Sequence, residues 1–259
     1  MTLPASIEQL LADAIAHHGL TSYSAEIQAL ARATVLLGVE PQAELPVGTS
    51  KLGGTPDLPN TLTWPTNGDD KLLAFLGQID LASLPQSGLP LPPVGMLYVF
   101  SDQESGDNNP HWLGLYTEGG QLHPHPVPEP ESFADENQDE PFGQLAIVRA
   151  TASVSLPSPL DNLVRVADND ADAYGELVQA FLHDSRQKEP TSRMFGYADG
   201  HGDPVGQTDR ELIICVQSFF ANKRAFMNFW DAGSMTLTAA RAPLQRGEIV
   251  DTRATLFSH

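Results

Sequence analysis

Ser50-Lys-Leu-Gly-Gly-Thr-Pro-Asp-Leu-Pro59, which is followed by Trp64-Pro65, is the stretch that decides the fold of this chain. Its adjacent glycines permit a tight turn with positive φ, and its prolines keep the next segment extended. Met194-Phe-Gly-Tyr-Ala-Asp199 echoes this stretch in the second half of the chain. Neither stretch carries an obvious catalytic group, so both indicate how the chain folds and not which reaction it could catalyse.

A glutamine inside an apolar strand follows each glycine turn. Gln78 lies in the first of these strands, and Gln217 lies in the second. Gly95 and Gly233 then open the next strand in each half. This order predicts a duplicated β-unit, with two similar surfaces about a pseudo-twofold axis and a binding groove between them.

The first 40 residues are predicted to form a helical hairpin. Residues 6–18 are amphipathic at helical spacing, and Gly19 ends them. A second helix is expected from Ser24 to Gly38, because its apolar residues recur at helical spacing. This hairpin, residues 1–40, is expected to pack on a main domain over residues 41–259.

After residue 41, apolar runs of strand length are separated by proline and glycine. We predict strands over residues 72–81, 95–100, 113–116, 145–148, 152–155, 212–219, 225–230 and 234–239. A helix is predicted over Asp172–Lys188, and the acidic, proline-rich residues 123–141 are expected to form a mobile surface loop. The predicted class is α+β, in which related β-rich units near 50–125 and 190–259 share a core.

The charge of the chain is strongly negative and unevenly placed. The formal net charge is −19, and residues 1–148 carry 3 basic against 19 acidic side chains. Such a surface repels phosphate backbones and anionic membranes, so we expect neither nucleic acid nor a membrane as a partner. A single cysteine and the lack of a signal-peptide pattern lead us to expect a soluble cytoplasmic protein.

Several of these segments together resemble the YwqG-like family, a group of bacterial domains of unknown function. The resemblance implies an α+β fold and no established activity. Where the family continues from Gly-Tyr toward a proline and a glutamine, Gln207 is the counterpart in this chain. The matching segments are Lys51–Pro59 with Trp64-Pro65, Phe75–Leu81 with Leu84-Pro85, Gly95–Phe100, Phe195–Tyr197 and Trp230–Gly233 with Met235–Thr238.

Each polar or aromatic candidate has a structural and a functional interpretation. A glutamine inside a buried strand can hydrogen-bond to the backbone of a neighbouring turn. Alternatively, Gln78 and Gln217 form a matched pair that faces a shared cleft. A tryptophan after a turn anchors the core, or it forms a pocket wall. An aspartate beside a turn usually caps it. The candidate ligand- or partner-binding residues are Trp64, Gln78, Asp80, Tyr197, Gln207, Gln217, Trp230 and Asp231.

Motifs for metals and for catalysis are weak. His111, His123 and His125 are candidate ligands for a transition metal, but the His-x-His spacing of the last two lies in a proline-rich loop and fixes no third ligand. The acidic run from Asp168 lacks the glycine and glutamate of a calcium loop. Cys215, within an apolar strand, is expected to be inert. We therefore expect no metal and no cofactor.

The leading hypothesis is a non-enzymatic protein- or peptide-binding or regulatory module that uses the groove or the acidic first half. One version is an immunity-type protein that neutralises a basic toxin by charge complementarity. The competing hypothesis is a small-molecule enzyme in which Asp57, Asp80, Asp231 or His201 converge on the groove.

Overall fold

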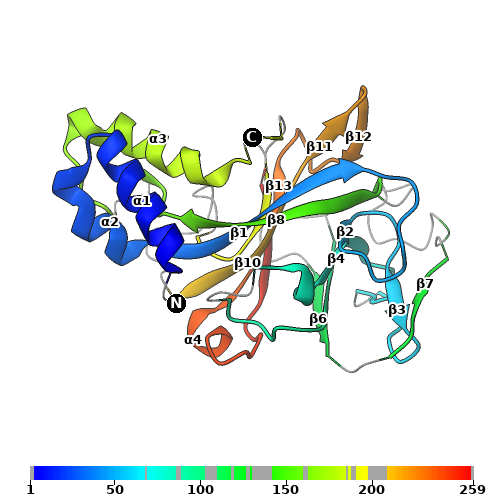
Figure 1. Ribbon diagram of the computed structural model, residues 1–259. Coiled ribbons are helices and arrows are strands. Elements are labelled where there is room, and N and C mark those ends of the chain that lie inside the picture. Colours follow the sequence, from blue (N-terminus) through cyan, green and yellow to red (C-terminus); the bar gives the residue numbers. More distant parts are fainter. Residues whose placement is uncertain are drawn as a thin grey trace.

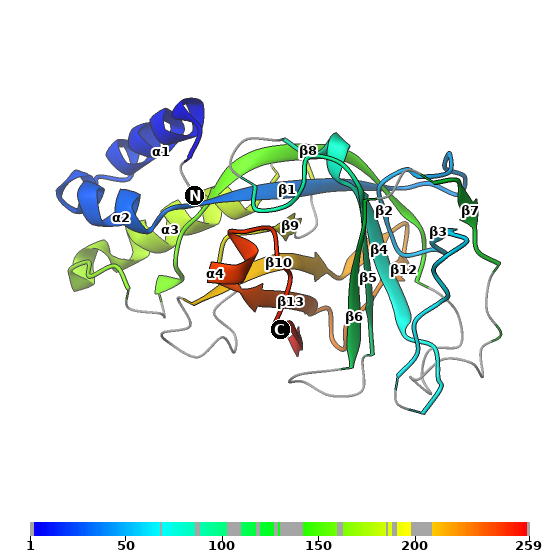
Figure 2. The ribbon, with the colours of Figure 1, turned by 90° about the horizontal axis from the view of Figure 1, so that it is seen from below.

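Ten strands form one antiparallel sheet that folds back on itself (Figures 1 and 2). Its order is β14-β13-β10-β9-β1-β8-β2-β4-β5-β6. This computed structural model describes residues 3–67, 69–85, 89–102, 110–117, 120–126, 129, 142–159, 163–184, 186–187, 191–197 and 209–257.

The strands of the large sheet differ greatly in length. The two long central strands are β1 (Arg32–Pro41) and β8 (Leu145–Ser155). On one side lie β2 (Lys51–Leu52), β4 (Ala74–Asp80), β5 (Met96–Ser101) and β6 (His111–Tyr116). On the other side lie β9 (Ser192–Met194), β10 (Arg210–Gln217), β13 (Ser234–Ala240) and β14 (Arg253–Phe257).

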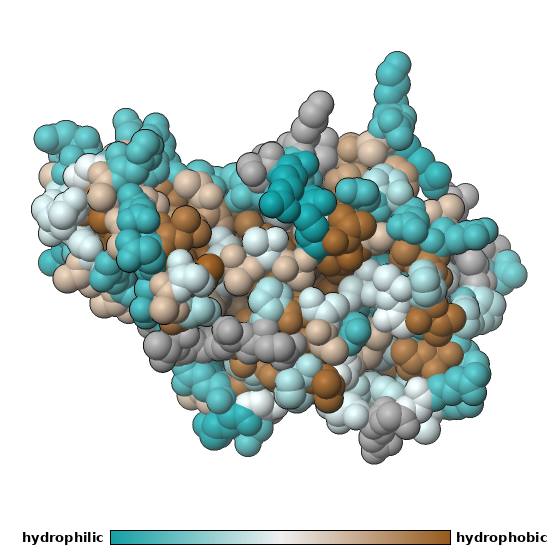
Figure 3. All heavy atoms as spheres, in the orientation of Figure 1, coloured by the Kyte–Doolittle hydropathy of each residue, from teal (hydrophilic) through white to brown (hydrophobic). Residues whose placement is uncertain are grey.

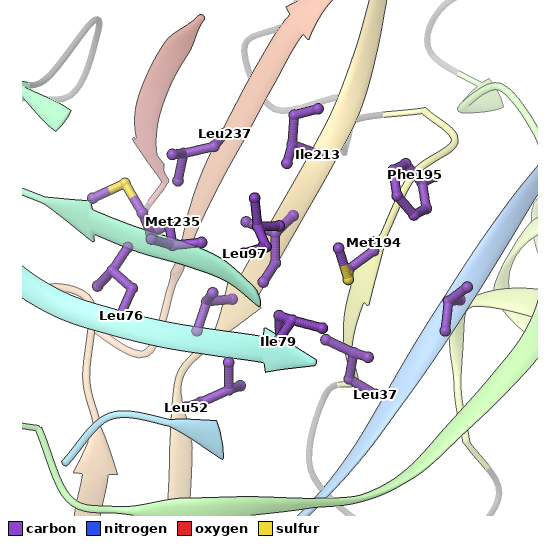
Figure 4. Close-up of a cluster of buried hydrophobic side chains, with 14 of the residues drawn as sticks. Leu37, Leu52, Leu76, Ile79, Leu97, Met194, Phe195, Ile213, Met235 and Leu237 are labelled. Carbon is purple, nitrogen blue, oxygen red and sulfur yellow. The ribbon is translucent and has the colours of Figure 1, made fainter. Parts of the chain in front are cut away.

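The two sides of the sheet enclose the main hydrophobic core. Side chains from β1, β2, β4 and β5 point toward side chains from β9, β10 and β13 (Figure 4). The edges of the sheet also approach each other, because His111 Nε2 lies 2.8 Å from Thr252 Oγ1, just before β14. The sheet is therefore nearly closed, which protects most of its strand edges from solvent.

Two small ribbons stand apart from the large sheet. One pairs β3 (Asp57–Pro59) with β7 (Leu122–Pro124), and the other pairs β11 (Phe219–Ala221) with β12 (Arg224–Met227). The second ribbon projects from the body, and we call it the β11–β12 ribbon (Figure 1).

Helices cover one end of the central strands (Figure 1). They are α1 (Ala5–His17), α2 (Ser24–Leu30) and α3 (Ala171–Leu182), which enclose a second core with Val154 and Leu156. The short α4 (Arg241–Leu244) follows β13. None of the helices in the described ranges is long and apolar enough to cross a membrane.

The predicted second helix is wrong beyond Leu30. Arg32–Val39 forms the buried first part of β1 instead, and β1 pairs with β8 and β9. Because this segment is mostly apolar and short, its pattern fits a buried strand as well as a helix. Its pairing with distant strands decides the outcome, and it places residues 32–40 in the sheet rather than in a separate helical unit.

Three further predictions need adjustment. The two short strands predicted within 145–155 are one strand, β8, and the helix predicted over 172–188 ends at Leu182. Residues 122–124 belong to β7, while most of the predicted 123–141 loop lies outside the described residues. The other predicted strands occur near their expected positions, whereas the strands besides β1 that were not predicted are β2, β3, β7, β9, β11 and β14.

Candidate functional site

The Gly53-Gly54 turn is built for close backbone approach. Both glycines have positive φ, 63° and 69°. A Cβ on Gly53 would collide with the carbonyl oxygen of Gly143, and Gly54 N donates to the carbonyl of Phe142 at 2.8 Å. The turn therefore fastens β2 to the chain that leads into β8.

Beside this turn, Gln78 belongs to a buried polar network around Asp57. Gln78 Nε2 donates to Asp57 Oδ2 at 2.8 Å and to the Thr49 carbonyl at 3.0 Å, and Gln78 Oε1 accepts from Asp57 N at 2.7 Å. Lys51 Nζ lies 3.1 Å from Asp57 Oδ2. Tyr98 OH donates to the Asp57 carbonyl at 2.6 Å. Because both amide protons of Gln78 are used inside the fold, Gln78 acts here as a structural link between turn and strand.

A turn of similar geometry follows β9 in the other half. Phe195 and Gly196 have φ of 64° and 90°, and Gly196 N donates to Glu211 Oε1 at 2.9 Å. Thr34 Oγ1 donates to the carbonyls of Met194 and Phe195 at 2.9 and 3.0 Å. This turn is thus fixed to the central strand β1 and to β10.

Charged groups lie buried around Glu211. Glu211 Oε2 lies 3.7 Å from Arg32 Nη1 and 3.4 Å from Arg241 Nε. Burial raises the pKa of Glu211 and lowers the pKa of Arg32, and the attraction between them opposes both changes. Removal of one charge from such a cluster would leave an uncompensated charge in the interior, which is strongly destabilising.

Tyr197 supports this cluster rather than a cleft. The Arg32 guanidinium lies 3.7 Å from the centre of the Tyr197 ring, and Tyr197 OH donates to the Leu30 carbonyl at 2.8 Å. Burial raises the pKa of Tyr197. The side chain therefore ties α2 to the sheet.

Gln217 has a different environment from Gln78. Its Nε2 lies 3.4 Å from Cys215 Sγ, and within the described part of the chain its Oε1 is buried without a hydrogen-bond donor. Thr236 Oγ1 is likewise buried without a partner there, and Thr236 pairs with Cys215 across β10 and β13. A buried carbonyl oxygen that lacks a donor costs about 1–3 kcal/mol. The Oε1 atom of Gln217 is thus unsatisfied, and it is buried although the residue as a whole is 7% exposed.

Trp230 is far more exposed than Trp64, the other candidate tryptophan. Its exposed fraction is 51%, whereas that of Trp64 is 7%. Trp230 has φ of 49° and Ala232 has φ of 74°, within one turn that Gly233 N closes onto the Phe229 carbonyl at 2.8 Å. For a residue with a side chain, the left-handed conformation costs about 1–2 kcal/mol. The fold therefore holds an indole in solvent at a cost in strain.

This turn is attached to the base of the β11–β12 ribbon. Ser218, which directly precedes β11, donates from its N to the Gly233 carbonyl at 3.0 Å. Its Oγ accepts from Phe229 N at 2.9 Å. Phe220, on β11, is 37% exposed. We call Phe220 and the Phe229–Gly233 turn together the Trp230 surface.

The remaining candidates have local structural roles. Trp64 packs against Phe75 and Phe100, and its indole donates to the Leu73 carbonyl at 2.8 Å. Asp80 accepts from Ala82 N at 3.0 Å and caps a turn of 3₁₀-helix over Leu81–Ser83. Gln207 and His201 lie outside the described residues.

The candidates do not form one site. Gln78 and Trp64 belong to the half with β4, whereas Gln217, Trp230 and Asp231 gather at the ends of β10 and β13. Asp57 and Asp80 are engaged in separate local interactions. Among the residues that the structure describes, no group of three or more His, Cys, Asp or Glu side chains could hold a metal ion.

The sequence analysis did not predict the two cationic side chains at the end of the β11–β12 ribbon. Lys223 and Arg224 are exposed at its turn. The available signal was the acid-free run from Leu212 to Trp230, in a chain with 33 acidic residues.

A family model described as Domain of unknown function (DUF1963) matches residues 50–248, and the chain belongs to this family. The search of curated proteins found no match for the chain.

Proposed function

We propose that this protein is a non-enzymatic module that binds a protein or peptide through the Trp230 surface. The observation that carries the proposal is the half-exposed Trp230 at positive φ. A strained residue persists where the surrounding structure holds it, and such residues cluster at functional sites. Tryptophan is also among the residues that dominate binding energy at protein interfaces.

Exposed apolar area supports this location. Phe220 and Trp230 are both large, exposed and connected through Ser218, as described above. Binding that buries an indole releases water from apolar surface, which contributes roughly 25 cal/mol for each Å². Of the residues in the competing enzyme hypothesis, Asp57 and Asp80 serve the fold in separate places. Asp231 lies in the Trp230 turn, away from both of them, and His201 lies outside the described residues.

The test compares Trp230→Ala with a matched control, Leu10→Ala. Leu10 lies on α1 and is 50% exposed, so the two variants remove similar exposed apolar groups. Each purified protein is used to capture partners from its native lysate. We expect one protein to be retained by the wild type and Leu10→Ala but not by Trp230→Ala. Equal retention by all three proteins would refute a role for this surface.

A second candidate function uses the acidic first half of the chain. This half carries 3 basic and 19 acidic side chains, which suits an immunity-type protein that binds a basic toxin. Such a complex should dissociate when salt is raised, because surface charges are screened beyond about 8 Å at physiological ionic strength. A basic partner that Trp230→Ala still retains, and that high salt releases, would favour this function over the first.

The duplicated architecture and the YwqG-like resemblance are part of the proposal. Support comes from two consecutive positive φ values after β2 and again after β9, and from the similar strand order on either side of β1 and β8. In both halves a glutamine lies on the next strand, and the two glutamines are Gln78 and Gln217. A single buried cysteine, Cys215, is consistent with work in a reducing cytoplasm.

A further inference from the structure

The β11–β12 ribbon is a basic exception in an acidic protein. Residues 212–230 contain Lys223 and Arg224 but no aspartate or glutamate, while the whole chain has a net charge of −19. Neither cation forms an ion pair within the described ranges. The Arg224 guanidinium instead lies 5.3 Å from the ring centre of Phe226.

The geometry of the ribbon presents these cations to solvent. Asn222 and Lys223 have φ of 52° and 63°, as in the tight turns that suit two-stranded hairpins. The ribbon projects from the body, and the space-filling view shows a hydrophilic projection at its end with apolar surface at its base (Figures 1 and 3). Phe220 lies on β11, below this turn, and the Trp230 turn is attached to the base of the ribbon through Ser218.

We infer that the Trp230 surface and the ribbon together bind an acidic peptide segment of another protein. Trp230 and Phe220 pack against an apolar side chain of the segment, and Lys223 and Arg224 bind its carboxylates. This inference rests on the proposed function and adds the chemical class of the partner.

Charge favours this occupant over two others. A nucleic acid also suits aromatic and basic side chains, but its many phosphates would face the acidic body as well as the two cations. A second copy of this chain also offers an acidic surface. However, a contact between the ribbon of one copy and the body of another joins two different surfaces, so further copies could add and form an open assembly. A short segment needs to contact only residues 212–233, in which Lys223 and Arg224 stand against one carboxylate, Asp231.

The chain itself shows how an acidic residue is bound in this fold. Asp57 Oδ2 lies 3.1 Å from Lys51 Nζ and accepts a hydrogen bond from Gln78 Nε2 at 2.8 Å. At the ribbon, the cations Lys223 and Arg224 lie in solvent instead. The same pairing of carboxylate and cation is therefore open to a group from outside the chain.

The experiment is a selection from a random dodecapeptide phage library on the full-length protein at physiological ionic strength. We expect acidic peptides with an aromatic or aliphatic residue to be enriched. The Lys223→Glu/Arg224→Glu variant should lose this enrichment for acid. The control is Arg165→Glu/Arg246→Glu, because Arg165 and Arg246 are exposed cations away from the ribbon and the change in net charge is the same.

One enriched acidic peptide is then titrated by fluorescence polarisation. Two exposed ion pairs contribute about 0.2–1 kcal/mol each, so Lys223→Ala/Arg224→Ala should weaken binding roughly 2- to 30-fold. Trp230→Ala should weaken the binding at least 10-fold, as expected for a tryptophan at the centre of an interface. Circular dichroism shows that each variant is folded.

The outcomes separate the inference from the proposed function. If neutral or basic peptides are enriched and Trp230→Ala abolishes their binding, the proposed function stands and the acidic partner is refuted. If acidic peptides bind the ribbon variant as well as they bind the wild type, the inference is refuted. If no peptide is enriched, peptide recognition here is refuted, and the lysate capture with Trp230→Ala decides the proposed function by itself. Binding that depends on protein concentration through self-association would support a second copy instead.

Discussion

Gln78 and Gln217 occupy comparable strands, and replacing each by leucine should have opposite effects on stability. Gln78→Leu removes two buried hydrogen bonds, to Asp57 N and to the Asp57 carboxylate, and one partly buried hydrogen bond, to the Thr49 carbonyl. The two Asp57 groups left behind remain buried, because Asp57 is only 3% exposed. Each unsatisfied group costs about 1–3 kcal/mol, and the apolar leucine recovers part of the total.

The expected net effect for Gln78→Leu is a loss of roughly 3 kcal/mol in the free energy of unfolding. At about 2 °C per kcal/mol for a chain of this size, the Tm should fall by about 6 °C. Gln217→Leu loses only a long contact to Cys215 and removes an oxygen that has no donor in the described structure. Its unfolding free energy should therefore change by less than ~1 kcal/mol or increase.

Urea unfolding followed by circular dichroism measures both variants against the wild type. Glutamate is the conservative control at position 78, since it keeps one acceptor but places a second carboxylate beside Asp57, and we expect it to destabilise as well. Equal losses for Gln78→Leu and Gln217→Leu would refute the reasoning, because they would show that Gln217 has a buried donor in solution.

Three further predictions concern the turns and one ion pair. Trp230→Gly removes the strain of φ 49° and should raise stability by roughly 0.5–1 kcal/mol while it reduces partner retention; a loss in thermal unfolding would contradict this. Gly53→Ala, which collides with a carbonyl oxygen, should cost roughly 3 kcal/mol, but Gly19→Ala, with free space at φ 73°, only about 1 kcal/mol in the same urea assay. The backbone N–H of Arg186 donates a hydrogen bond to the Asp184 carboxylate, and together with the Arg149 guanidinium it lowers the pKa of Asp184. The Asp184 carboxylate therefore stabilises the fold at pH values above the unfolded-state pKa of ~4, and this stabilisation is lost as the pH falls through the folded-state pKa. Asp184→Asn should thus be less stable than the wild type at pH 7 and equal to it in strong acid, and a difference that does not depend on pH would argue against the pair.

Much of the sheet was predictable from local pattern. The apolar runs that became β4, β5, β10 and β13 have strand length, and a glycine directly precedes β5 and β13, which is the signal a buried strand leaves in sequence. The two glycines of the β2 turn predicted positive φ, and both have it. These properties depend on the chain near each residue.

The candidate site was predictable only in part. The sequence around a single tryptophan near a turn does not show whether its side chain packs in the core or faces solvent. Here Trp64 packs in the core and Trp230 faces solvent. The difference follows from neighbours that are distant in sequence, such as Phe100 beside Trp64. Equally, Gln78 finds Thr49 and Asp57 in the fold, while the oxygen of Gln217 finds no donor among the described residues.

The acidity of the chain, the positions of the turns and about half of the labelled strands follow from the sequence alone, because composition and short-range sterics determine them. The tertiary structure decided that Arg32–Pro41 is a central strand, since its pairing with β8 outweighs a helical pattern that its own residues allow. It also decided which polar groups are satisfied and which indole remains in solvent. Burial and hydrogen bonding depend on how distant segments pack, and no local pattern contains that information.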